Sequence, residues 1–234
     1  MKLSFTIFVV LFSFLNQDSY SQKISFQIKG EYNYFSMNDL KDIQKEMLNE
    51  FHFINIPLSS VESYPPYYGI QFRLGLTNIN NLNYGIMVDL SSTGGRIHYR
   101  DYSGEIRIDN ILSIISSGVF LEKKHFLNEW ISIAYGISGQ VIFAKLELLH
   151  LTRIGNGNMQ QNLTFDCTSY GVEPNVSLTL NRYSFSLGFN LGYLAAESAQ
   201  YKSNKDARLH KANGNPVNLD MNCFRIGLIL GYTI

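Results

Sequence analysis

Charged side chains recur on one face of the apolar-rich segments of this chain, and they are the first candidates for chemistry. We group seven of them as a charge network: Arg73, Asp89, Glu105, Arg107, Asp109, Glu173 and Arg225. Lys29 and Glu31 follow the same pattern. Acids and bases enclosed in a narrow space must pair, because an unpaired buried charge is costly. The network therefore indicates either a gated pore or path for protons or ions, or a salt-bridge plug, and we favour the plug.

A second cluster mixes aromatic rings with charge. His98, Tyr99, Arg100 and Tyr102 stand together between two apolar-rich segments, beside Arg96 and Asp101. Such a mixture could bind a glycan, lipopolysaccharide headgroups or a protein, although a solvated hairpin tip is the commoner use. The preceding Thr93-Gly94-Gly95 lacks the helix and the Lys-Ser/Thr of a phosphate-binding loop, so we predict a turn there.

No residue pattern in the sequence marks a reaction centre. The histidines are scattered without the spacing of metal ligands, and no nucleophile motif surrounds any serine. We therefore expect no catalytic residues, no cofactor, no metal and no enzymatic activity. The one enzyme alternative is a lipid-modifying site at the end of a barrel, in which His150 would take part.

Alternating segments place these residues on strands, in which successive side chains point to opposite faces. In the terminal segment Phe224, Ile226, Leu228, Leu230 and Tyr232 share one face, whereas Arg225, Gly227 and Gly231 share the other. Eight such segments can be read, near residues 24–31, 68–76, 84–91, 105–121, 131–138, 171–180, 183–193 and 223–234. The fourth changes phase after Asn110, which predicts a β-bulge.

The connections alternate in length, as they do in a transmembrane barrel. Short turns are expected at 78–81, 122–128 and 181–182, and longer loops at 37–66, 92–103, 150–161 and 197–221. Transmembrane barrels have short periplasmic turns and long outer loops. The sequence therefore predicts an all-β fold, an eight-stranded antiparallel up-and-down transmembrane β-barrel, whose interior is narrow enough to be filled by side chains. Cys167 and Cys223 would lie roughly 9–10 Å apart across one intervening strand, so two free thiols are expected.

The first long loop contains a short helix in this prediction. Leu40, Ile43, Met47 and Phe51 repeat near helical spacing on one side. The helix could be a lid over the barrel mouth, a docking surface, or a loop folded back on the barrel end, and we favour the last. Tyr64, Tyr67 and Tyr68 are expected in an interfacial aromatic girdle.

The first 21 residues have the pattern of a secretory signal peptide. Lys2 precedes an apolar stretch from Leu3 to Leu15, and Ser19-Tyr20-Ser21 offers small residues for cleavage before Gln22. We expect residues 22–234 to form one barrel domain. The 19 basic and 19 acidic residues cancel, which argues against a nucleic-acid partner. No later segment has the 18 or more consecutive apolar residues of a helical span.

The chain from Ile24 to Ile234 resembles the small outer-membrane β-barrel proteins of Bacteroidota. The resemblance lies in the terminal strand, the helical first loop, and the stretch from Ser91 to Glu105. It implies an eight-stranded barrel and no agreed catalytic residues. The terminal Ile234 departs from the Phe that ends many such barrels.

These patterns favour a monomeric barrel of the cell envelope, located in the cell outer membrane. We expect a structural or surface-interaction role carried by the outer loops, with a narrow, porin-like pore for small solutes as the alternative. The expected partners are outer-membrane lipid and lipopolysaccharide, the barrel-assembly machinery during insertion, and an unidentified extracellular ligand, without nucleic acid.

Overall fold

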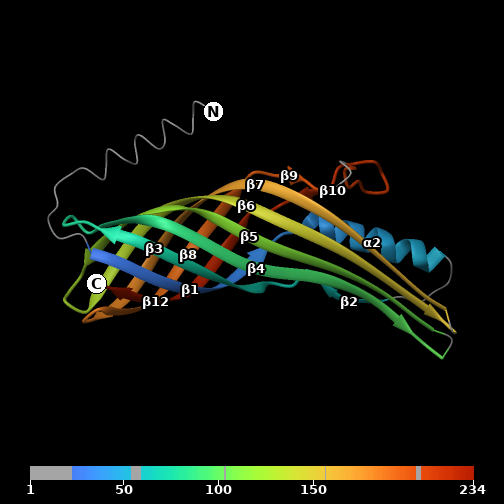
Figure 1. Ribbon diagram of the computed structural model, residues 1–234, viewed down its shortest axis with the longest axis horizontal. Coiled ribbons are helices and arrows are strands. Elements are labelled where there is room, and N and C mark those ends of the chain that lie inside the picture. Colours follow the sequence, from blue (N-terminus) through green and yellow to red (C-terminus); the bar gives the residue numbers. More distant parts are fainter. Residues whose placement is uncertain (1–22, 54–58, 103, 156, 204–206) are drawn as a thin grey trace.

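Eight antiparallel strands close into a ring in the computed structural model (Figure 1), which describes residues 23–53, 59–102, 104–155, 157–203 and 207–234. The ring strands are β1 (Lys23–Phe35), β3 (Tyr67–Thr77), β4 (Leu82–Arg100), β5 (Gly104–Phe126), β6 (Ile131–Ile154), β7 (Gly157–Arg182), β8 (Phe185–Ala196) and β12 (Cys223–Thr233). Each pairs with its neighbour in this order, and β12 returns to pair with β1. The predicted eight-stranded barrel is confirmed. The predicted signal peptide lies outside the described residues.

The outer wall of the ring is apolar and exposed. In β12, Phe224, Leu228 and Leu230 are at least 60% exposed, whereas their neighbours Cys223 and Arg225 are at most 2% exposed. Aromatic pairs stand near both ends of the wall: Tyr193 with Phe224 at 4.9 Å between ring centroids, and Phe185 with Tyr232 at 5.0 Å. A closed barrel with such a wall and such aromatic girdles is suited to lipid. No helix in the described residues is long and apolar enough to cross a membrane.

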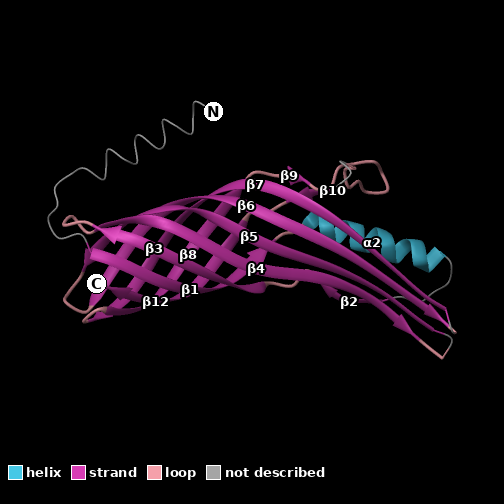
Figure 2. Ribbon diagram, viewed as in Figure 1, coloured by secondary structure: helices cyan, strands magenta, loops and turns pink. Residues whose placement is uncertain are grey.

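Four strands continue well beyond the ring (Figure 2). The pairing of β3 with β4 stops at Ser91, and the pairing of β7 with β8 stops at Gly171. The remainder stays paired as a sheet, and β2 (Ser59–Ser63) adds to its β4 edge. We call this part, residues 59–63, 92–100, 104–113, 145–154 and 157–170, the projecting sheet. The loops expected at 92–103 and 150–161 are therefore mostly strand, and Thr93-Gly94-Gly95 is not a turn but part of β4.

A helix and the last outer segment close the outer end of the ring. The helix α2 (Asn38–Phe53) lies against the inner face of the projecting sheet, the face continuous with the lumen (Figure 1). Short strands β9 (Ala199–Gln200), β10 (Lys202–Ser203) and β11 (Asn218–Leu219) follow β8. Buried side chains from all these parts form one apolar cluster, which we call the cap. It includes Phe35, Leu40, Ile43, Tyr64, Tyr67, Leu112, Leu146, Cys167, Tyr201, Leu219, Met221 and Cys223.

The cap confirms part of the helix prediction and corrects the girdle. The apolar stripe of α2 is covered, because Leu40 and Ile43 are buried and Met47 packs against them. The side chain of Phe51 lies outside the described residues. Tyr64 and Tyr67 are 3% and 7% exposed in the cap, and only Tyr68, at 80%, faces outward as a girdle residue would.

The expected bulge in β5 is absent. The register with β6 runs without a shift from Gly104 opposite Ile154 to Phe126 opposite Ser132. What changes is the apolar face. Ile108 and Leu112 point inward, where α2 and the cap cover them, whereas Ile115 and Val119 point outward at about half exposure. The phase change in the sequence therefore marks the passage from a sheet that packs on a helix to a wall that packs on lipid.

Candidate functional site

Five charged side chains meet in the middle of the lumen. Arg225 Nη1 lies 2.7 Å from Asp89 Oδ2, 3.2 Å from Glu173 Oε2 and 3.4 Å from Glu31 Oε2. Lys29 Nζ lies 2.7 Å from Glu31 Oε1 and 3.6 Å from Glu173 Oε1. All five side chains are at most 2% exposed. This central charge cluster ties β1, β4, β7 and β12 together across the barrel.

A second ion pair lies in the lumen. Arg73 bonds to Glu122, and its guanidinium sits 5.1 Å from the centroid of the Phe120 ring. Glu122 is not among the predicted network residues, because residues 122–128 are expected to form a turn, whereas β5 continues to Phe126. The missing signal was alternation: Ser116, Phe120 and Glu122 lie on the same buried face of β5, and that face continues through Glu122.

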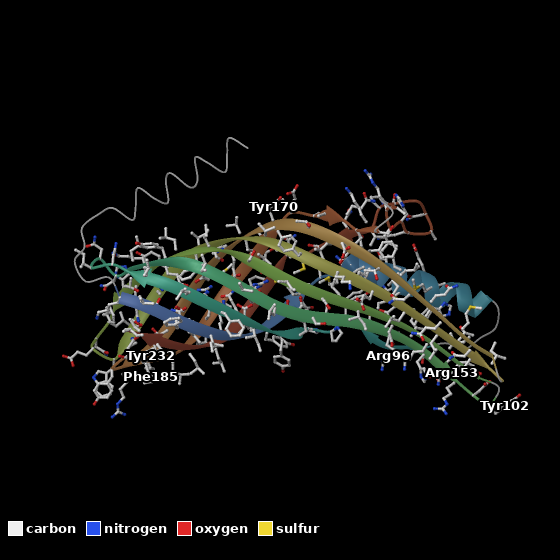
Figure 3. The ribbon with its side chains drawn as sticks, viewed as in Figure 1. Arg96, Tyr102, Arg153, Tyr170, Phe185 and Tyr232 are labelled. Carbon is white, nitrogen blue, oxygen red and sulfur yellow. The ribbon has the colours of Figure 1, made fainter. Side chains whose placement is uncertain are left out.

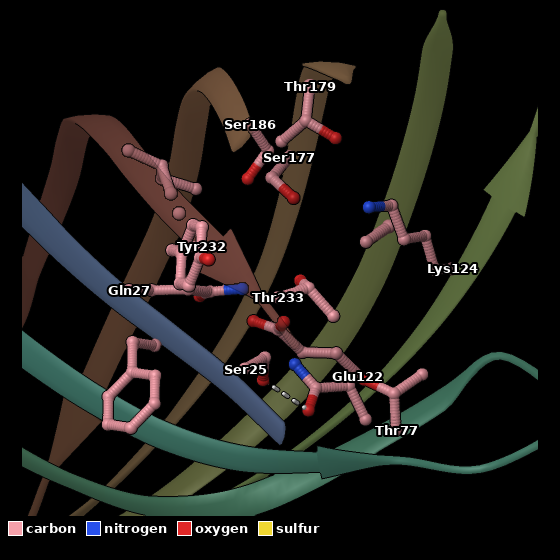
Figure 4. A pocket seen from close by; sticks show the side chains of 15 residues that line it. Ser25, Gln27, Thr77, Glu122, Lys124, Ser177, Thr179, Ser186, Tyr232 and Thr233 are labelled. Atoms are coloured by element: carbon pink, nitrogen blue, oxygen red, sulfur yellow. Dashed lines mark hydrogen bonds between the residues drawn. The ribbon is translucent and has the colours of Figure 1, made fainter. Parts of the chain in front are cut away.

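A small polar cavity, shown from close by in Figure 4, opens in the lumen where β1 begins and β12 ends. Its volume is about 50 Å³, and polar side chains surround most of it, among them Ser25, Gln27, Asn83, Glu122 and Lys124. Ser25 Oγ donates a hydrogen bond of 3.1 Å to Asn83 Oδ1 within this lining. The cavity has room for one or a few water molecules. Glu122 lines the cavity and also binds Arg73, so this ion pair borders the cavity.

The lumen therefore holds four of the seven residues of the predicted charge network: Arg73, Asp89, Glu173 and Arg225. The prediction was wrong in placing Glu105, Arg107 and Asp109 on the inner face. They lie on the outer face of the projecting sheet, because β5 keeps a continuous register while its apolar face changes sides. Lys29 and Glu31, which share the inward pattern of β1, complete the central cluster.

The outer face of the projecting sheet carries four arginines: Arg96, Arg100, Arg107 and Arg153 (Figure 3 labels Arg96 and Arg153). Arg96 Nε lies 2.6 Å and Arg107 Nε 3.1 Å from the carboxylate of Asp109, while Arg153 Nη1 lies 3.7 Å from Glu105. The side chains of Arg96, Arg107 and Arg153 remain 42–56% exposed despite these partners. We call this surface the arginine face. Glu105 and Asp109 are the carboxylates beside its arginines, and Lys145, Glu147 and Asp166 lie on the same outer face nearer the ring.

The four predicted loop-binding residues do not form one site. Arg100 is one of the four arginines of the outer face, and His98 lies on the same face. His98 Nε2 lies 3.3 Å from Glu105 Oε1. Tyr99 points to the inner face beside Ile106, and its hydroxyl donates to Asp101 Oδ2 at 2.9 Å. That hydrogen bond to a carboxylate raises the pKa of Tyr99. Tyr102 stands fully exposed at the hairpin tip (Figure 3).

The remaining candidates for chemistry lie in the cap and on the inner face of β6. Cys167 and Cys223 are buried, free thiols, and Cys167 Sγ donates to the carbonyl of Ala199 at 3.3 Å. His150 Nε2 lies 3.1 Å from Thr152 Oγ1. Within the described residues, no group of three or more His, Cys, Asp and Glu side chains could hold a metal ion.

Comparison with known proteins finds similarity in structure only. No protein-family model matches the sequence, and no curated protein matches it. A major outer membrane protein from Thermus thermophilus matches with a TM-score of 0.50 at 9% identity, over 90% of this chain and 99% of that one. Ail, the attachment invasion locus protein of Yersinia pestis, in complex with the heparin analogue sucrose octasulfate, matches with a TM-score of 0.35 at 12% identity, over 92% and 99%. Neisserial surface protein A matches with a TM-score of 0.34 at 12% identity, over 91% and 96%.

The Thermus structure supports the fold, and the apolar wall supports the place of that fold in a membrane. Closed barrels with a lipid-facing apolar band are built for bacterial outer membranes. The predicted location in the cell outer membrane is confirmed on these grounds. The projecting sheet, with its arginine face, extends beyond the ring strands that carry this apolar wall.

Proposed function

We propose that this outer-membrane barrel has no enzymatic activity and acts by presenting its projecting sheet to a ligand outside the cell. The observation that carries the proposal is the sheet itself. Its strands extend at least nine residues past the ring, or about 30 Å along a strand at roughly 3.3 Å per residue. Since backbone pairing continues nearly to the tips, the side chains on it are held in fixed positions, as recognition requires.

The arginine face supports an anionic ligand. Guanidinium groups bind sulfate, phosphate and carboxylate through paired N–H donors, and the side chains of Arg107 and Arg153 stay 42% and 56% exposed beside Asp109 and Glu105. Sulfated or phosphorylated glycans, including lipopolysaccharide headgroups, have this chemistry. The ligand class in this proposal is therefore an anionic glycan.

The lumen supports a surface role over a pore. The cap covers the outer end, the central charge cluster fills the middle, and the ion pair between Arg73 and Glu122 stands above the small cavity.

We also propose that residues 1–21 are a cleaved signal peptide and that the chain is one of the small Bacteroidota barrels it resembles. Insertion would then need the barrel-assembly machinery.

A binding measurement tests the proposal. Refolded protein in detergent is titrated with a sulfated oligosaccharide and with its unsulfated counterpart. We expect binding of the sulfated form only, and a loss of about tenfold, equivalent to roughly 1.4 kcal/mol, in the double variant Arg100→Gln/Arg153→Gln. Arg182→Gln, an exposed arginine at the opposite end of the barrel, is the matched control and should bind as the parent does. Equal binding by the double variant and the parent would contradict an arginine-based site.

A further inference from the structure

The projecting sheet has one open edge. From Gly157 to Leu163, β7 pairs with β6 on one side, and no strand of the described residues pairs with its other side. On that side β10 pairs only with Phe165 and Asp166, and the pairing with β8 begins at Gly171. All seven residues from Gly157 to Leu163 are exposed. The opposite edge of the sheet differs, because β2 covers β4 there.

The open edge lacks the residues that usually protect such edges. Natural edge strands carry lysine, proline or bulges, which keep other strands from adding to their free N–H and C=O groups. The segment from Gly157 to Phe165 contains no charged residue and no proline, and its register with β6 has no shift. Met159 and Leu163 are 60% and 56% exposed on its inner face. The edge is thus suited to accept another strand.

We propose that this edge pairs in antiparallel register with the same edge of a second copy of the protein. In a register centred on Gln161, Met159 of one copy faces Leu163 of the other on the inner face. On the outer face Gln160 faces Asn162, and amides opposite one another can hydrogen-bond. The set is self-complementary, as a twofold interface requires, and no charge opposes a like charge. The paired length, 158–164, fits between the hairpin tip and β10.

The direction of the strands decides where the second copy lies. In each copy β7 runs from Gly157, at the tip of the projecting sheet, to Arg182, at the opposite end of the barrel (Figure 1). Antiparallel pairing therefore points the two barrels in opposite directions, so the two copies lie in two facing membranes. One pairing of seven residues is a small contact, and stable attachment between membranes would come from many copies acting together.

Clustering of vesicles tests this self-pairing independently of any glycan. Protein is reconstituted into phosphatidylcholine liposomes without glycan, and clustering is followed by light scattering. We expect parent vesicles to cluster. Gln161→Lys vesicles and Gln161→Glu vesicles should each stay dispersed, because like charges then meet at the twofold axis. A mixture of the two should cluster again, because the charges are opposite.

Two controls separate self-pairing from folding and from added charge. Each variant must show the heat-dependent gel mobility of the folded barrel before it is scored. Asn213→Lys and Asn213→Glu place the same charges on an exposed position of the last outer segment and should cluster as the parent does. Dispersed parent vesicles, clustering by either Gln161 variant alone, or no recovery in the mixture would each overturn the proposal. A glycan-binding result of either sign leaves this test unaffected.

Discussion

Arg225 is the residue on which the interior depends most. It is 1% exposed and faces three carboxylates from three other strands, so each acidic partner gains a counter-charge from one guanidinium. Burying these charges is costly in itself, and a buried ion network is weak support for stability as long as it stays complete. Removal of Arg225 alone is destabilising, because the three carboxylates then stay buried without their counter-charge.

We expect Arg225→Ala to lower the free energy of unfolding by about 3–5 kcal/mol, the usual cost of breaking a buried ion pair. The measurement is unfolding of the refolded barrel by denaturant, followed by tryptophan fluorescence and heat-dependent gel mobility. Arg182→Ala removes an exposed arginine and should unfold as the parent does. Equal midpoints for Arg225→Ala and the parent would show that the cluster does not hold the strands together.

Alternation was enough to predict the inward position of individual residues inside the ring. Arg73, Asp89, Glu173 and Arg225 all follow from a period of two on strands with a lipid-facing wall. The partners could not be predicted, because pairing across a lumen depends on the stagger of strands far apart in the sequence. Glu105 shows a second limit of prediction from alternation. Its inward position was predicted on the assumption that the apolar face of β5 points outward along the whole strand, and in β5 that face changes sides.

The helix α2 packs with the last outer segment in the cap and also binds it through polar contacts. Its acidic side binds that segment: Lys211 Nζ lies 2.8 Å from Asp39 Oδ1 and 2.9 Å from Asp42 Oδ2. Glu46 accepts from the backbone N–H of Ala212 at 2.9 Å. Lys211 lowers the pKa of Asp42, and the hydrogen bonds to Asp39 and Asp42 raise the pKa of Lys211.

We expect Lys211→Met to speed hydrogen–deuterium exchange in α2, because the segment that covers the helix then lacks its ionic contact. The contact is complete above the ordinary pKa of aspartate and below that of lysine, about 3.9 and 10.4. It is lost as pH falls through the lowered pKa of Asp42, or as pH rises through the raised pKa of Lys211. The difference between parent and variant should therefore be largest near neutral pH and vanish at both extremes.

Lys202→Met is the control for this exchange experiment, since Lys202 is an exposed lysine of the same outer segment. It should leave the exchange of α2 unchanged. Exchange in α2 that is equal in parent and Lys211→Met at neutral pH would mean that the apolar stripe alone holds the helix.

The elements divide into those that a local pattern predicts and those that it does not. The helix followed from Leu40, Ile43 and Met47, because a 3.6-residue period needs only neighbours in sequence. The projecting sheet did not follow. Residues 92–100 contain Thr93, Gly94 and Gly95, which favour a turn locally, yet long-range pairing with β5 and the cover of α2 make them strand.

The whole molecule is a barrel filled along its length by three different means. The cap is apolar, the central cluster is ionic, and the cavity at the other end is polar and about 50 Å³ in volume. Only the apolar cap involves α2. Removal of the helix would open the cap and leave the ionic layer in place.

We expect no single-channel conductance from the refolded parent in a planar bilayer, and none after deletion of residues 39–50. The ionic layer is built from β1, β4, β7 and β12, and the deletion touches none of them. An open 16-stranded porin in the same bilayer, of the class whose interior is an aqueous channel, is the positive control. A stable channel that appears on deletion would make α2 a lid and restore the narrow pore as the leading function.

The change of apolar face along β5 restricts how the length of the projecting sheet can change in evolution. Side chains alternate, so an insertion of two residues in each strand above the lipid lengthens the projection by about 7 Å and keeps every face in place. An insertion of one residue would turn the apolar residues that pack on α2, such as Ile97 and Ile108, toward water. The distance that the protein spans above its membrane is therefore adjustable only in discrete steps, and its length in other species should change by even numbers of residues per strand.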